Sequence, residues 1–133
     1  MNDVAETPRK NFVEFDLAHE MAEAEKKKPW AMGRFAQTLV KRPDMRVVLI
    51  SIEKGAELKE HHADGSISVQ VLKGAVRFTA GGETRELKTG QVLTLGASIK
   101  HEVEATEDTA FLLTISWPEP QRLEAMPHRG YGN

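Results

Sequence analysis

The chain has 133 residues, a formal net charge of −2 and a pI near 6.2. This length suits one domain with one hydrophobic core, and the slightly acidic balance argues against a nucleic-acid partner. The absence of cysteine excludes disulfides and thiolate metal sites, and no apolar run is long enough to cross a membrane. We therefore expect a cytoplasmic protein with neither a nucleic-acid nor a membrane partner.

Residues 1–30 are predicted to form an N-terminal arm with one short helix. Asp16 is a suitable N-cap residue, and Leu17 and Met21 stand four residues apart on one helical face. Pro29 ends the pattern, because proline cannot continue a helix.

From Phe35 onward the period of the apolar residues changes to two, which predicts β-strands. Eight short segments rich in Val, Ile, Leu, Thr and Phe are separated by turn signals such as Lys73-Gly74 and Gly81-Gly82. The segments are AQTLV, MRVVLISIEK, SISVQVLK, AVRFTA, TRELK, QVLTLG, HEVEA and TAFLLTISW. Short strands at this spacing predict an all-β sandwich or barrel, and the proline-rich residues 118–133 predict a C-terminal tail.

Glycines and histidines recur at regular spacing within these strands. Five residues separate Gly55 from His61, and four residues separate Gly96 from His101. The residues are Gly55, His61, Gly74, Gly90, Gly96 and His101. This spacing resembles the two motifs of the cupin superfamily. The sequence around the motifs resembles that of the small stand-alone, RmlC-like bacterial cupins. The resemblance covers about residues 35–117, and it implies a single double-stranded β-helix (jelly-roll) barrel over residues 31–117.

The resemblance also implies a metal site, which this sequence matches in part. His61 and His101 occupy the positions of two of the four usual cupin metal ligands. Ala63 stands at the position of the second histidine of the first motif, and Ile67 stands at the position of its glutamate. The site is therefore a reduced version of the family's metal site.

A third ligand would have to come from outside the motif positions. His62 is one candidate, but neighbouring side chains on a strand point to opposite faces unless a bulge intervenes. Other candidates are Glu60, Gln70 and His128. A divalent metal (Zn, Ni, Fe or Mn) is one alternative. A metal-free pocket is the other, with the histidines hydrogen-bonded to each other, to water or to a ligand.

We expect the ligand pocket to include His61, His101, Gln70 and Arg46. Alternation from Ile67 places Gln70 on the outer face of its strand, so Gln70 reaches the pocket only if the register slips. Arg46 is interpreted either as a partner for an acidic ligand or as a surface charge.

The implied function is that of a small-molecule-binding cupin domain with a pocket around His61 and His101. The alternative is a metal-dependent enzyme, of dioxygenase or isomerase type, that acts on a small polar or acidic substrate. A structural module with a filled barrel is a third interpretation, and no residue is singled out as catalytic. Similar small cupins dimerise through a sheet. The resemblance therefore implies a homodimer with Phe35–Lys41 and the N-terminal arm at the interface.

Overall fold

The computed structural model describes residues 5–7 and 12–118, apart from the side chains of Glu60 and His61. In chain order the elements of this part are α1 (Leu17–Glu25), the 3-10 turn η1 (Ala31–Gly33), β1 (Arg34–Arg42), β2 (Met45–Ile52), β3 (Glu57–His61), β4 (Ser66–Lys73), β5 (Ala75–Ala80), β6 (Glu83–Lys88), β7 (Val92–Leu95), β8 (His101–Ala105) and β9 (Thr109–Ser116). Each of the eight predicted segments contains a strand. Sequence reasoning missed β3, because its sequence ELKEH has no β-branched or aromatic residue.

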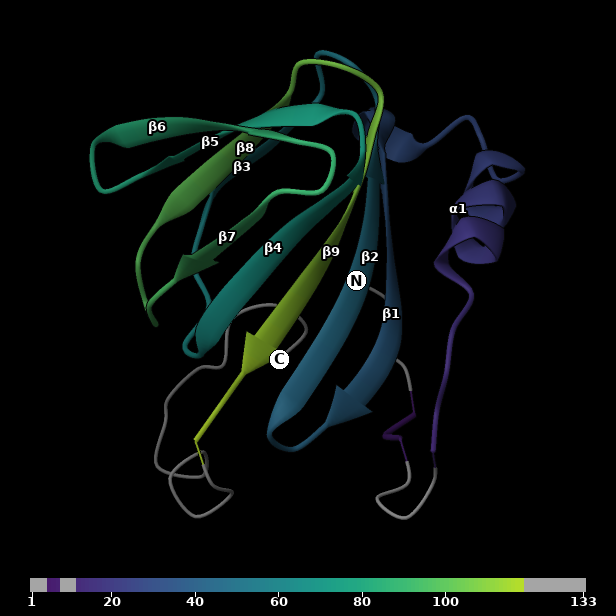
Figure 1. Cartoon of the computed structure of the whole chain (residues 1–133), viewed down its shortest axis with the longest axis horizontal. Coiled ribbons are helices and arrows are strands. Elements are labelled where there is room, and N and C mark those ends of the chain that lie inside the picture. Colours follow the sequence, from purple (N-terminus) through teal and green to yellow (C-terminus); the bar gives the residue numbers. More distant parts are fainter. Residues whose placement is uncertain (1–4, 8–11, 119–133) are drawn as a thin grey trace.

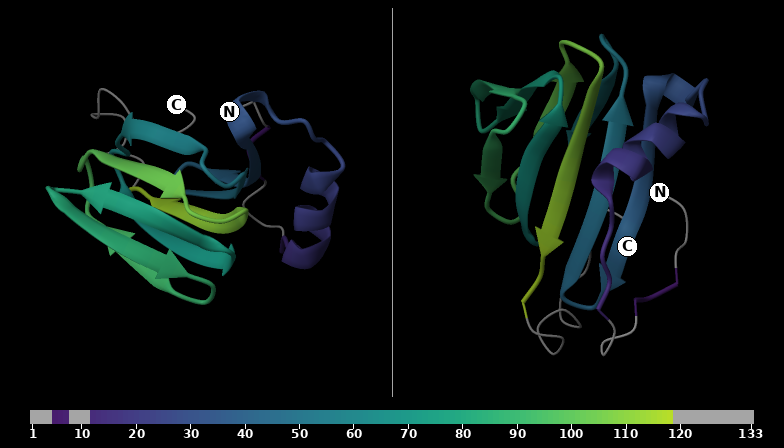
Figure 2. Two further views of the ribbon diagram at one scale, coloured as in Figure 1. Left: turned by 90° about the horizontal axis from the view of Figure 1, so that it is seen from above. Right: turned by 45° about the vertical axis from the view of Figure 1, so that its right-hand side comes forward.

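The strands form two antiparallel sheets that face each other (Figure 1). One sheet, which we call sheet A, has the strand order β1-β2-β9-β4-β7, and the other, sheet B, has the order β3-β8-β5-β6. The view from above shows the sheets as two layers (Figure 2). The predicted all-β barrel is confirmed.

Apolar side chains fill the space between the two sheets. In β4, Ile67, Val69 and Val71 point inward and are at most 4 % exposed, whereas Ser68 and Gln70 between them are more open. This is the period of two that the sequence shows. Full burial of a Leu, Ile, Val or Phe side chain stabilises the fold by roughly 1.5–3 kcal/mol. The buried cluster consists of Val48, Ile50, Ile52, Leu58, Ala63, Ile67, Val69, Val71, Val76, Phe78, Leu87, Val103, Ala105, Phe111, Leu113, Ile115 and Trp117.

The predicted helix, α1, lies outside the barrel beside sheet A (Figure 2). The Asp16 carboxylate accepts a hydrogen bond from the backbone N–H of His19 at 3.2 Å, which confirms Asp16 as the N-cap. Of the helix residues only Ala24 is buried. Trp30 holds the end of the helix, because its indole Nε1–H donates to the carbonyl of Ala24 at 2.9 Å. Within the described ranges, no helix has the length and apolar character that spanning a membrane requires.

Candidate functional site

The two motif histidines come together at one end of the barrel, where β3 ends and β8 begins. The connection between β3 and β4 and the connection between β7 and β8 lie at this end. They are joined by a hydrogen bond of 2.6 Å from the Ser98 N–H to the Ala63 carbonyl. We call this region, the last residues of β3, the first residues of β8 and the two connections, the histidine end.

A β-bulge in β3 sets the register of the two histidines. Leu58 pairs with Val103 and His61 pairs with His101, so three steps along β3 (61 − 58) match two along β8 (103 − 101). Without the extra residue, Glu60 instead of His61 would stand opposite His101. The bulge therefore lies before His61. It brings His61 to the register position opposite His101, while the side chain of His61 lies outside the described part.

His101 is a buried histidine with a defined tautomer. Its side chain is 3 % exposed, and its ring stacks on Phe78 with centroids 5.3 Å apart. Nδ1 lies 3.0 Å from the carbonyl oxygen of Ile99, and a carbonyl only accepts, so Nδ1 carries the proton. The lone pair of the neutral ring is then on Nε2. His101 is therefore equipped to accept a hydrogen bond or to bind a metal through Nε2.

The environment of His101 keeps its ring neutral. Burial away from water lowers the pKa of His101, and the nearby His62 lowers it further, while the hydrogen bond to Ile99 acts in the opposite direction. Because burial is the largest of these effects, the net shift is downward from the usual value. At neutral pH the His101 ring is thus uncharged, and its Nε2 has the lone pair that a hydrogen-bond acceptor or a general base needs.

His62 lies at the rim of the histidine end, as the strand alternation predicts. Its side chain is 36 % exposed, and Nε2 lies 3.9 Å from Oδ1 of Asp64. The Ser98 hydroxyl donates to the same Oδ1 at 3.3 Å, and Oδ2 of Asp64 is buried without a hydrogen-bond partner among the described residues. Sequence reasoning singled out no functional role for Asp64, so its place beside His62 is new information from the structure.

Arg46 points into the barrel. It lies on the same face of β2 as the core residues Val48 and Ile50, and it is 3 % exposed. Its guanidinium carbon lies 5.2 Å from the centroid of the Trp117 ring, a cation–π contact. β2 begins where β9 ends, and Ser66, the first residue of β4, also pairs with that end of β9. Arg46 therefore belongs to the same end of the barrel as the histidines, which excludes its interpretation as a surface charge.

The structure does not bring Gln70 to the histidines. Gln70 is exposed between the buried Val69 and Val71, so it faces out of the barrel, and the register slip needed to turn it inward does not occur. Two other candidate ligands cannot be placed, because the side chain of Glu60 and the whole of His128 lie outside the described residues.

The described side chains alone do not complete a metal site. Among them, and thus without Glu60 and His61, no group of three His, Asp or Glu side chains has the arrangement that holds a metal ion. His101 supplies one imidazole nitrogen, whereas His62 is turned toward Asp64. Three protein ligands are the usual number for a catalytic metal, so the fit of a metal depends on His61 and on one more donor.

Comparison with known proteins gives one family and many similar structures. A family model described as "Cupin domain" matches residues 48–117. A protein of unknown function from Streptococcus pyogenes is 26 % identical, with a TM-score of 0.68, covering 89 % of this chain and 99 % of its own. A cupin 2 conserved barrel domain protein from Leptotrichia buccalis is 30 % identical, with a TM-score of 0.64, covering 71 % of this chain and 46 % of its own.

A more distant structure with the same fold is an enzyme. Salicylate 1,2-dioxygenase from Pseudoaminobacter salicylatoxidans is 21 % identical, with a TM-score of 0.66, covering 88 % of this chain and 34 % of its own. No curated protein matches the chain. The family model covers more than half of the sequence, and its match includes β2 from Val48 onward, the histidine end and β9. The chain therefore belongs to the cupin family.

Proposed function

We propose that this cupin domain binds a small polar molecule at the histidine end, with His101 as the hydrogen-bond acceptor. One observation carries the proposal, namely the Nδ1–H donated to Ile99 by a buried, neutral imidazole. That bond fixes the tautomer and the plane of the ring, so Nε2 is a prearranged acceptor for a ligand hydroxyl or amide. The register position of His61 opposite His101 supports a second polar group on the same ligand.

The ligand is an acid in this proposal. Arg46 is a buried cation at the same end of the barrel, and it is packed on Trp117. A guanidinium binds a carboxylate through two parallel hydrogen bonds more strongly than it binds a neutral group. A small hydroxy acid combines both features, because its hydroxyl donates to His101 and its carboxylate accepts from Arg46.

The test compares lactate with propionate, which lacks the hydroxyl group, by NMR of the histidine ring signals of the full chain. We expect lactate to shift the His101 signals and propionate to do so at least tenfold more weakly, since a hydrogen bond to a buried acceptor is lost. The His101→Gln variant should lose the preference. His19→Gln is the matched control, because His19 is on α1 and its side chain is 62 % exposed.

Two results would contradict the binding function at this site. One is a lactate response that survives His101→Gln. The other is an unchanged His101 signal at saturating concentrations of every small hydroxy acid and amide tried.

A metal-dependent enzyme, of dioxygenase or isomerase type, is the second candidate, and one observation favours it. A metal-binding histidine usually donates its second ring N–H to a carbonyl or carboxylate, as His101 does to Ile99. His101 and His61 would hold the metal, with a third ligand from His62, Glu60 or His128. A bound metal would supply a Lewis acid or an oxygen-activating centre. The enzymatic fold relative above supports only the shared fold.

Elemental analysis of the chain, purified without chelators, separates the two candidates. About one metal ion per chain that is lost in His101→Gln would establish the metal site. A metal content far below one ion per chain would support the metal-free binding site instead.

We also propose that the chain forms a homodimer through the edge of sheet A. β1 is an edge strand of sheet A, and among the described residues the Thr7 N–H donates to the Lys41 carbonyl on its outer side at 2.7 Å. Phe12, Val13 and Phe15, which precede α1, are exposed apolar side chains that a second copy would cover. Light scattering coupled to gel filtration should give the mass of two chains, and a single-chain mass at every concentration would refute the dimer.

A further inference from the structure

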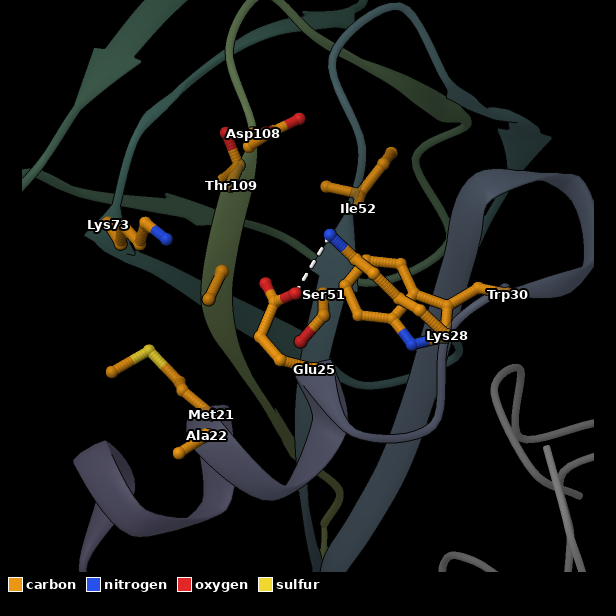
Figure 3. A pocket seen from close by; sticks show the side chains of 11 residues that line it. Met21, Ala22, Glu25, Lys28, Trp30, Ser51, Ile52, Lys73, Asp108 and Thr109 are labelled. Carbon is orange, nitrogen blue, oxygen red and sulfur yellow. Dashed lines mark ion pairs between the residues drawn. The ribbon is translucent and has the colours of Figure 1, made fainter.

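A cavity lies outside the barrel, between α1 and the outer face of sheet A, and neither motif histidine lines it (Figure 3). It has a volume of about 160 Å³. We call it the α1 cavity and define it by the residues that line it, namely Met21, Ala22, Glu25, Lys28, Trp30, Ser51, Ile52, Lys73, Asp108, Thr109 and Ala110. The helix contributes few buried residues, so it covers this part of the sheet without filling the space beneath it.

The floor of the α1 cavity carries the hydroxyl group of a buried serine. Ser51 is 5 % exposed, and its side chain makes no hydrogen bond within the described residues. Figure 3 shows its hydroxyl pointing into the space in front of α1. The neighbouring hydroxyl of Thr109 differs, because it already lies within 2.9 Å of the Ala75 carbonyl and accepts from the Ala75 N–H. A hydroxyl that faces a cavity and has no protein partner is expected to bind water or a ligand.

Three of the four charged side chains around the α1 cavity are already engaged. Lys28 forms an ion pair of 2.8 Å with Glu25, and its ammonium also lies 4.6 Å from the Trp30 ring. The hydrogen bond to Glu25 is the main cause that raises the pKa of Lys28. Asp108 accepts from the backbone N–H of Lys54 at 2.9 Å.

Lys73 is the remaining charge. It stands across the cavity from the Lys28–Glu25 pair, with its ammonium directed toward the cavity (Figure 3). No carboxylate of the described residues lies within ion-pair distance of it. The carboxylate of Asp108 points to the side away from Lys73 (Figure 3). A ligand in the cavity would therefore meet the exposed Lys73 ammonium, which has no ion-pair partner among the described residues, on one side and the Ser51 hydroxyl on the floor.

The other walls of the α1 cavity are apolar. Met21 and Ala22 of α1 form one side, and the Trp30 ring, Ile52 and the buried Ala110 form the rest of the apolar lining. The Trp30 ring is held in place by its hydrogen bond to Ala24, so this wall is rigid on its indole side. An inorganic anion would pair with the Lys73 ammonium but leave these apolar walls in contact with water. A ligand that also has a short apolar chain would cover the walls.

From this arrangement we propose that the α1 cavity binds a short-chain monocarboxylate, held by the ammonium of Lys73 and the hydroxyl of Ser51. The apolar chain of the ligand lies against Met21, Ala22 and Trp30. The volume of the cavity equals about five water molecules, which matches a ligand of about six non-hydrogen atoms. A ligand of that size binds with a Kd on the order of 1 mM. This site is independent of the histidine end and of the function proposed there.

The test uses butyrate, butyramide and butylamine, which have nearly the same size and differ in charge. Each is titrated into the full chain and followed by proton–nitrogen correlation NMR spectra. We expect butyrate to shift the backbone signals of α1 and of Ala110, with the neutral amide and the cationic amine at least tenfold weaker. Shifts confined to the His101 region would place the carboxylate in the wrong site and overturn the proposal.

Variants then assign the contacts. Lys73→Met should weaken butyrate at least tenfold, and Ser51→Ala should weaken it about fivefold. Lys88→Met is the matched control, because this exposed lysine lies on sheet B, and it should leave the Kd unchanged. His101→Gln should also leave it unchanged, which separates this site from the histidine end. Equal binding of butyrate and butyramide, or butyrate binding that survives Lys73→Met, would show that the cavity is only a gap in packing.

Discussion

The histidine end and the α1 cavity are two candidate binding regions of opposite character. The histidine end is marked by family motifs, and aromatic contacts hold its polar side chains, with His101 stacked on Phe78 and Arg46 on Trp117. The α1 cavity has open space and a lysine, Lys73, without an ion-pair partner among the described residues, but no motif marks its residues. A sequence motif can therefore identify a prearranged polar group. The space for a ligand depends instead on how a separate element, here α1, covers the sheet.

The largest expected effect is a loss of stability when one glycine in each region is replaced by alanine. At the histidine end, a Cβ on Gly65 would clash with the backbone carbonyl of Ser116. Beside the α1 cavity, a Cβ on Gly74 would clash with the carbonyl of Asp108, and Gly74 also has a φ of +87°. We expect Gly65→Ala to cost about 2 kcal/mol and Gly74→Ala, which adds backbone strain, about 3 kcal/mol.

Urea unfolding measures both losses, with Gly82→Ala as the control. Gly82 has a φ of +78°, but a Cβ added there would meet no atom within 4 Å, so only the backbone strain of about 1 kcal/mol remains. If all three variants lose the same stability, the close approaches at Gly65 and Gly74 do not matter.

The second effect is a pH dependence that belongs to the histidine end alone. Burial lowers the pKa of His101 in the folded chain, so below the usual value of about 6.5 the unfolded chain takes up a proton first. The stability from the neutral ring is therefore complete above that pH and is lost as the pH falls toward the folded pKa. Comparison of the unfolding free energy at about pH 7.5 and about pH 5.5 should show a loss in the native chain that His101→Gln reduces. An unchanged pH dependence in His101→Gln would remove His101 as its source.

The third effect tests the wall of the α1 cavity. Trp30→Phe removes the indole N–H that donates to Ala24 at 2.9 Å, and it keeps an aromatic ring in the wall. We expect a loss of about 1 kcal/mol and faster amide hydrogen exchange in α1. The His101 ring signals should stay unchanged, because the two regions lie apart. Exchange in α1 as slow as in the native chain would mean that packing alone holds the helix.

The smallest effect concerns the rim histidine. His62 is partly exposed, and its Nε2 lies 3.9 Å from Oδ1 of Asp64, beyond hydrogen-bond distance, so this pair contributes little stability. We expect His62→Ala to change stability by less than about 0.5 kcal/mol. Lactate binding and any metal content should remain. A loss of metal as complete as in His101→Gln would show that His62 turns inward when metal is bound.

Much of the barrel could be predicted from local patterns, and the exceptions have local causes. The alternation in SISVQVLK and TAFLLTIS is strong, and both segments form strands as predicted. β3 has mostly charged residues, so its strand conformation comes from pairing with β8. Gln70 was named as a pocket residue against its own alternation, and the regular pairing of β4 with β7 keeps it outside. Alternation was the better guide at this position.

The sequence by itself determined the period of the strands, the N-cap of α1, and the two motif histidines of a cupin barrel, whereas α1 ends at Glu25, before the proline that was expected to end it. These features depend on neighbouring residues, so they are visible in the linear chain. Only the tertiary structure decided that the bulge in β3 sets His61 opposite His101, that Arg46 lies inside the barrel, and that α1 covers a cavity beside Lys73. The reason is physical: each of these features joins residues from different elements, and strand pairing and side-chain packing alone determine which of them meet.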